Sequence, residues 1–128
     1  MEKIRSICVM KELFQALSVL EGRLIENYGV TLNEAMVLCS VGSDTVSAGT
    51  IAECTGLTPS HLSKVIGSAE KKGLLIRTMG AKDKRQMYFS LTEKAEKCLN
   101  RIKEQGLEIP EMLKDLFGQN DFTMKKNQ

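Results

Sequence analysis

The side chains best suited to redox, metal or acid–base chemistry are few in this chain, which has four cysteines and one histidine. Cys8, Cys39, Cys54 and Cys98 are at least 15 residues apart, whereas zinc sites and dithiol motifs pair cysteines at close spacing. The first residues lack a secretory pattern, so we expect no disulfide framework. The thiols should be mostly small buried groups, with Cys39 and Cys98 in the core and Cys54 packed at the end of a short helix. We therefore expect no metal, no cofactor and no enzymatic activity.

A different chemistry, electrostatic binding, is indicated by basic residues that gather in one segment. Residues 58–86 carry a formal charge of +5, whereas the rest of the chain sums to −3. The basic residues of this segment are Lys64, Lys71, Lys72, Arg77, Lys82, Lys84 and Arg85. Such a local excess is typical of a surface that binds a polyanion, although a merely solvated face has the same composition. Which of the two interpretations applies depends on the helices and strands that carry these residues.

The overall composition fits one globular domain. The chain has 128 residues, of which 42% are hydrophobic and 27% charged, enough for a single core. No run of apolar residues approaches the ~18 that a membrane span needs. We expect a cytoplasmic protein with no membrane partner.

Apolar residues three and four positions apart predict a long helix over residues 4–28, which Gly29 ends. The stretch 31–34 fits a capping box in which Thr31 and Glu34 satisfy free amides at the start of a second helix. This second helix should end near residue 42. Both predictions rest on local sequence alone.

The next predicted helices form a pair with a tight turn between them. Ser47 is a candidate cap for a short third helix, and Gly56 can adopt the positive φ of the turn. Thr58 and Pro59 begin a fourth helix that ends at Gly73. The face of this helix predicted to be exposed carries Ser60, His61, Ser63, Lys64, Gly67 and Ser68. Glycine inside a helix costs ~1 kcal/mol relative to alanine, so Gly67 either permits close approach of a partner to the helix backbone or weakens the helix.

After this helix the apolar period changes from near 3.6 to 2, which predicts a hairpin of strands 74–79 and 86–91. Thr92 should cap a further helix, and Pro110 should start a last short one. The class is therefore mainly α with a small β-hairpin wing, a winged helix-turn-helix. The basic segment coincides with the fourth helix and the hairpin, which favours DNA binding with the helix in a major groove about 12 Å wide.

Four short stretches between Leu57 and Thr92 form a more specific pattern. They are Thr58-Pro59-Ser60-His61-Leu62-Ser63, Glu70-Lys71-Lys72-Gly73-Leu74, Lys82-Asp83-Lys84-Arg85 and Leu91-Thr92. In these stretches the sequence resembles the bacterial multiple-antibiotic-resistance regulators, the MarR family. The spacing between the wing Asp-x-Arg and the Leu-Thr pair is the most specific part of the likeness.

The resemblance implies a homodimeric transcription regulator, usually a repressor, which binds a pseudo-palindromic operator in double-stranded DNA. A small-molecule effector or an oxidant often releases such repressors. Arg85 matches the wing arginine that enters the minor groove, and Asp83 matches the acid that orients it. The DNA-binding residues implied in this way are Thr58, Ser60, His61, Ser63, Lys64, Arg77, Lys82, Asp83, Lys84 and Arg85.

Helices on both sides of the winged core have apolar faces that the core is too small to cover. We expect a single domain over 1–128, with the winged core at 31–92 and dimerisation helices at 1–29 and 93–118. Some relatives sense peroxides through a cysteine of the first helix, which makes Cys8 a possible redox sensor. Nearby Arg5 and Lys11 would favour its thiolate, and an inert packed cysteine is the alternative.

Two other functions remain open from the sequence. A winged-helix module that binds protein and not DNA would tolerate loss of Lys64 and Arg85, and its binding would depend little on salt. A thiol peroxidase that uses Cys54 with His61 is a weaker hypothesis, because no third group is evident to orient the histidine.

Overall fold

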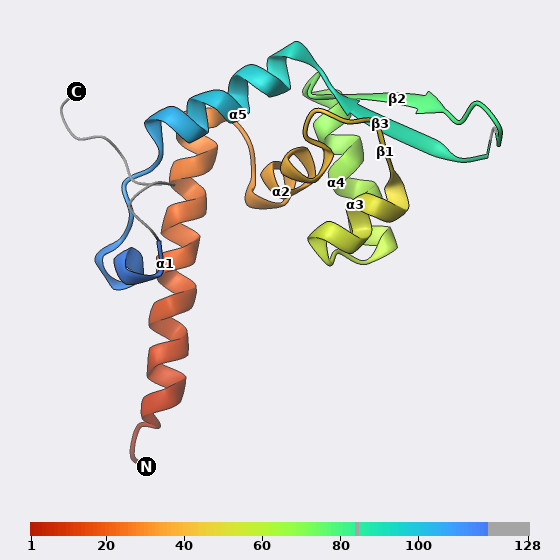
Figure 1. Cartoon of the computed structure of the whole chain (residues 1–128). Helices are drawn as coiled ribbons and strands as arrows, with labels where there is room; N and C mark the ends of the chain where they lie inside the picture. The colour runs from red at the N-terminus through yellow and green to blue at the C-terminus, as the bar shows by residue number, and fades with distance from the viewer. Residues whose placement is uncertain (84, 118–128) are drawn as a thin grey trace. The chain divides into compact units, whose positions relative to one another are not determined.

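The computed structural model describes residues 1–83 and 85–117. The elements follow in the order α1 (Arg5–Tyr28), α2 (Leu32–Val41), β1 (Val46–Ser47), α3 (Ala48–Thr55), α4 (Pro59–Lys71), β2 (Leu75–Met79), β3 (Met87–Leu91), α5 (Glu93–Gln105) and the 3₁₀ helix η1 (Glu111–Leu116) (Figure 1). They form two compact units, one of residues 32–100 and one of residues 1–31 with the chain from residue 101 onward. The predicted class, mainly α with a small β wing, is confirmed.

The first unit contains a helix-turn-helix whose helix starts are the ones predicted from sequence. The Ser47 hydroxyl accepts a hydrogen bond from the Thr50 amide at 3.2 Å, which caps α3. Gly56 has φ 74° in the turn, a conformation that glycine adopts without strain. The Thr58 hydroxyl accepts from the His61 amide at 3.3 Å, which caps α4. Each cap is local in sequence, and for this reason the motif could be predicted.

The core of this unit lies between the helices and one face of the wing. α4 packs against α2 and β2, buries one stripe of side chains, and leaves the opposite side of its first two turns exposed. Each buried large aliphatic or aromatic side chain contributes about 1.5–3 kcal/mol. The buried apolar residues include Val37, Leu38, Val41, Ile51, Leu62, Val65, Ile66, Ala69 and Phe89.

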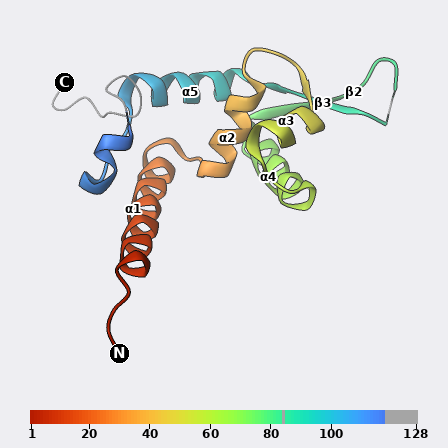
Figure 2. The same ribbon diagram turned by 60° about the horizontal axis from the view of Figure 1, so that its bottom comes forward.

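The wing is part of a three-stranded antiparallel sheet with strand order β1-β3-β2. Leu75 pairs with Leu91 and Met79 with Met87, while Val46 of β1 pairs with Phe89. The sequence predicted only the two-stranded hairpin, because β1 has two residues and its pairing partner is far away in the chain. The tip of the β2–β3 hairpin extends beyond α2, α3 and α4 in both views (Figures 1 and 2).

The second unit packs the C-terminal half of α1 against the chain that follows α5. Its buried residues include Leu20, Leu24, Leu107, Ile109 and Leu113. The Tyr28 hydroxyl donates to the carbonyl oxygen of Gly106 at 2.6 Å. The N-terminal half of α1 carries several exposed apolar side chains, of which Phe14 is 80% exposed.

Two of the cysteine predictions are wrong. Cys98 is buried as expected, but Cys39 and Cys54 are exposed, and Cys8 is half-buried. α2 is apolar around most of its circumference, so its sequence did not show that Leu38 faces inward and Cys39 outward. Neighbouring atoms still desolvate the Cys39 thiol enough to raise its pKa.

Candidate nucleic-acid interface

The first two turns of α4 present a polar surface. Ser60, His61, Ser63 and Lys64 are all exposed, because the residues between them face the core. Among the described residues, Lys64 has no acidic partner within salt-bridge distance. A short polar face with one uncompensated cation suits contact with base edges and phosphates.

His61 also contacts α2. Its Nε2 lies 3.4 Å from Nδ2 of Asn33, the second residue of α2. When the imidazole is neutral and carries its proton on Nδ1, Nε2 accepts a hydrogen bond from the Asn33 amide. The sequence did not predict this contact, because it joins two helices that are distant in the chain.

The wing tip holds an arginine that one carboxylate orients. Asp83 Oδ1 accepts from the Arg85 backbone amide at 3.0 Å and from Arg85 Nε at 3.4 Å. The Arg85 side chain is 92% exposed, so this pairing directs the guanidinium without covering it. Lys82 is also exposed, whereas Lys84 lies outside the described residues.

Gly80 permits the close turn at this tip. Its amide donates to the Gln86 carbonyl at 2.8 Å, and the Gln86 amide donates to the Asp83 carbonyl at 3.0 Å. A Cβ on residue 80 would lie 2.7 Å from the Asp83 carbonyl oxygen and 3.0 Å from Cε2 of Tyr88. No side chain fits there without a shift of the backbone that carries Asp83.

Arg77 joins the wing to α4. Its Nε and Nη2 donate to the two carboxylate oxygens of Glu70 at 3.0 and 2.8 Å. The guanidinium also lies 5.3 Å from the centroid of the Phe89 ring. The predicted phosphate contact of Arg77 stays a prediction. It would require the Arg77 guanidinium to bind a DNA phosphate while it remains paired with the Glu70 carboxylate.

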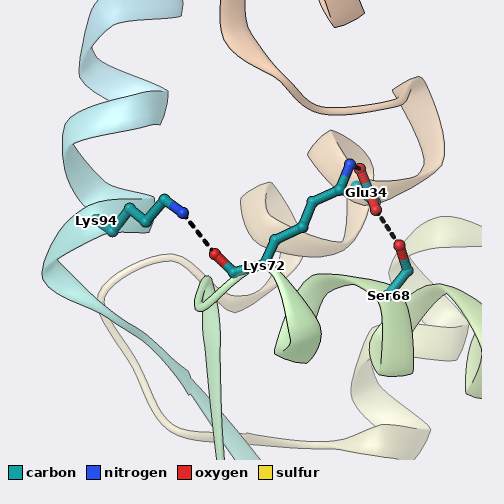
Figure 3. A network of polar contacts seen from close by, with 4 residues as sticks. All are labelled: Glu34, Ser68, Lys72 and Lys94. Carbon is teal, nitrogen blue, oxygen red and sulfur yellow. Dashed lines mark hydrogen bonds and ion pairs between the residues drawn. The ribbon is translucent and has the colours of Figure 1, made fainter.

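A polar network joins α2, the C-terminal end of α4 and α5 (Figure 3), and the sequence did not predict it. Glu34 is 2% exposed, and its carboxylate accepts hydrogen bonds from the Ser68 hydroxyl and from Lys72 Nζ, the latter at 2.7 Å. The Lys72 backbone carbonyl accepts from Lys94 Nζ at 2.7 Å. We call Glu34, Ser68 and Lys72 the Glu34 cluster. In the sequence, Glu34 fitted a capping box and Lys72 belonged to the basic segment, so neither indicated this network.

The ion pairs reduce the free positive charge of the basic segment. Lys72, Arg77 and Arg85 each have an acidic partner, and the pair of Lys72 with Glu34 is the most enclosed. Within residues 58–83 and 85–86, the cations without such a partner are Lys64, Lys71 and Lys82.

A pocket of about 320 Å³ lies between α3, the start of α4 and the base of the wing. Its walls are mostly apolar, with Leu62, Met87 and Phe89 among them, and Ser63 and Arg77 contribute polar groups. Over the described residues, no three metal-ligating side chains form a group and no helix is long and apolar enough to cross a membrane.

Comparisons with known proteins find one family model and solved structures of similar fold. Residues 28–86 match a model of the MarR family. The YusO protein of Bacillus subtilis is 26% identical with a TM-score of 0.61, over 77% of this chain and 70% of that one. BpsR of Bordetella bronchiseptica, whose DNA binding is regulated by 6-hydroxynicotinic acid, is 16% identical with a TM-score of 0.64, over 77% and 76%. Sco3205 of Streptomyces coelicolor, a MarR family regulator solved with DNA, is 21% identical with a TM-score of 0.63, over 80% and 68%. The search of curated protein sequences found no match.

Proposed function

We propose that this chain is a sequence-specific repressor of the MarR family that binds double-stranded DNA as a homodimer. The match of residues 28–86 to a model of that family supports this proposal. α4 enters the major groove and the tip of the β2–β3 hairpin enters the adjacent minor groove. The protein acts in the bacterial cytoplasm, where its operator lies.

One observation carries this proposal. A polar face of α4 with the unpaired Lys64, and an oriented and exposed Arg85 on a projecting hairpin, belong to the same compact unit. Direct readout needs polar side chains on a helix that fits the major groove, and a narrow minor groove attracts arginine.

Exposed apolar residues of α1, outside the winged unit, support the proposed dimer. Ile7, Met10 and Phe14 are three and four residues apart on α1 and are all more than half exposed. Contiguous exposed apolar area of this kind supports an interface between copies of the chain. A two-fold dimer would read half-sites about 10 base pairs apart.

We also propose that a small-molecule effector releases the protein from DNA. The pocket beside Ser63 and Arg77 has the size and apolar walls to accept a small organic molecule. BpsR provides a precedent, because a small carboxylic acid regulates its DNA binding. Cys8 remains a proposed redox sensor on the family resemblance alone.

Fluorescence anisotropy with duplexes from the regions that flank the coding sequence tests DNA binding. We expect log affinity to fall linearly with log salt, with a slope of roughly −0.9 per phosphate neutralised. Arg85→Ala and Lys64→Ala should each weaken binding by about 1–3 kcal/mol. Lys103→Ala, an exposed charge on α5, is the control and should leave affinity nearly unchanged.

The protein-binding alternative gives the opposite result. A slope near zero, or Arg85→Ala and Lys64→Ala variants that bind like the unaltered chain, would contradict the DNA-binding proposal. Affinity that depends on Lys64 for some base sequences and not others would identify it as a base contact rather than a phosphate contact.

A further inference from the structure

The N-terminal turn of α2 contacts α4 at two levels, and both contacts come from neighbouring residues. Asn33 reaches His61 in the first turn of α4, and Glu34 reaches Ser68 and Lys72 near its end. We infer that Glu34 is a positioning residue for DNA recognition, which sets the rotation of α4 about its own axis without touching DNA. This inference rests on the proposed DNA-binding function.

The chemistry of Glu34 favours a fixed geometry. The residue is 2% exposed, and each carboxylate oxygen accepts a hydrogen bond from α4 or from the residue that ends it (Figure 3). A buried carboxylate is strongly unfavourable unless it is paired and hydrogen-bonded. α4 therefore cannot rotate or slide past α2 without separating this carboxylate from its partners.

The contact between Glu34 and Ser68 lies next to Gly67, the interior residue of α4 that favours a helix least. Ser68 follows Gly67, and glycine is the residue least favourable to a helix interior apart from proline. Positions 61, 64 and 68 lie three and four residues apart, so they share one face of the helix. Fixing Ser68 therefore fixes the direction in which His61 and Lys64 point.

Lys72, the last residue of the Glu34 cluster along the chain, is also hydrogen-bonded to α5. The carbonyl oxygen of Lys72 accepts a hydrogen bond from Lys94 Nζ at 2.7 Å, so one residue joins α2 through its side chain and α5 through its backbone. Because Glu34 compensates the Lys72 charge, Lys72 should not serve as a phosphate contact even though it lies in the basic segment.

The test measures the ratio of affinity for the operator to affinity for a scrambled duplex of the same length. We expect Glu34→Ala to lower this ratio about tenfold, comparable to one mismatched base pair, with little change in non-specific affinity. Glu34→Gln should restore most of the ratio, because its amide can accept from Lys72 and donate to the Ser68 hydroxyl. Glu53→Ala on α3, exposed in the structure, removes the same charge and should leave the ratio unchanged.

A second measurement separates positioning from charge. Lys72→Met should leave the slope of log affinity against log salt unchanged, whereas Lys82→Met, at an exposed lysine of the wing, should reduce its magnitude by about 0.9. Hydrogen exchange should show faster exchange of α4 amides in Glu34→Ala than in Glu53→Ala. Ser68→Ala, which removes a single hydrogen bond, provides the same comparison if Glu34→Ala does not fold.

The outcomes distinguish failure of the inference from failure of the function. If the unaltered chain discriminates the operator and Glu34→Ala discriminates it equally well, the inference is wrong and the proposed function stands. A Lys72→Met variant with a reduced salt slope also overturns the inference. If the unaltered chain itself shows no discrimination, the proposed function fails, and the positioning role fails with it.

Discussion

At the scale of single residues, Gly67 is the position in α4 where the sequence left two interpretations open. A Cβ added there would have no atom within 4 Å, so alanine fits without a clash. Its side chain would also lie outside the stretch 60–64 that we propose contacts base edges. The structure thus gives no steric reason for glycine at this position.

We expect Gly67→Ala to stabilise the protein by about 0.5–1 kcal/mol, since alanine loses less conformational entropy on folding. Thermal or urea unfolding measures the change. Operator affinity should stay within about twofold of the unaltered chain. A large loss of affinity would show that DNA approaches the α4 backbone at this point, and Gly22→Ala, also in open space within a helix, is the matched control.

Sequence reasoning succeeded at residues whose structure depends on near neighbours. Thr58 caps α4, as its type and position predicted, and Asp83 contacts Arg85, as the family resemblance implied; both contacts span three residues or fewer. It failed for Cys39 and did not predict the cluster of Glu34, whose partners are 34 and 38 residues away. Nothing local distinguishes a glutamate that caps its own helix from one that also binds another helix.

At the scale of elements, a bidentate ion pair is one of the contacts that join the wing to α4. Glu70 and Arg77 lie on consecutive elements, and the Arg77 guanidinium also covers the Phe89 ring. The two side chains are only partly buried, at 27% and 45% exposed. Such pairs contribute little to global stability but can restrict local motion.

We expect Glu70→Gln to lower the free energy of unfolding by less than about 1 kcal/mol. Amides of β2 and β3 should nevertheless exchange faster, because the base of the hairpin loses one attachment to α4. Hydrogen exchange followed by mass spectrometry measures both strands. Glu93→Gln, which removes the exposed pair with Lys97 on α5, should leave wing exchange unchanged. Equal exchange in both variants would show that the pair does not restrain the wing.

The elements themselves were predictable to different degrees. Helices with apolar periods and capping residues were found close to their observed bounds. β1 was not predicted, because a strand of two residues has no detectable period. It exists only through its pairing with β3, in which Val46 lies opposite Phe89 and Ser47 opposite Tyr88. The third strand is a consequence of tertiary structure and not of local preference.

At the scale of the whole molecule, the exposed apolar face of α1 supports the proposed dimer. We expect Phe14→Glu, at a side chain that is 80% exposed, to shift the protein toward monomer and to weaken operator binding. Sedimentation velocity at micromolar concentration measures the oligomeric state. Ile76→Glu, at an exposed apolar residue of β2, should leave it unchanged. A monomeric unaltered chain at that concentration would contradict the dimer itself.

The net charge of the segment 58–86 also has to be reconsidered at this scale. The sequence gives +5, and the structure adds an internal carboxylate from outside the segment, Glu34, which pairs with Lys72. A count along the chain therefore overestimates the charge available to a polyanion. Only the tertiary structure identifies which basic residues remain available.

The link between Glu70 and Arg77 has one further consequence. It relates the hairpin base to α4 within one compact unit, so the spacing of the two proposed groove-binding segments is restricted. Supercoiling changes the angular offset between successive grooves of a duplex. Affinity for an operator should consequently vary with the superhelical density of the DNA that contains it, even though its base sequence is unchanged.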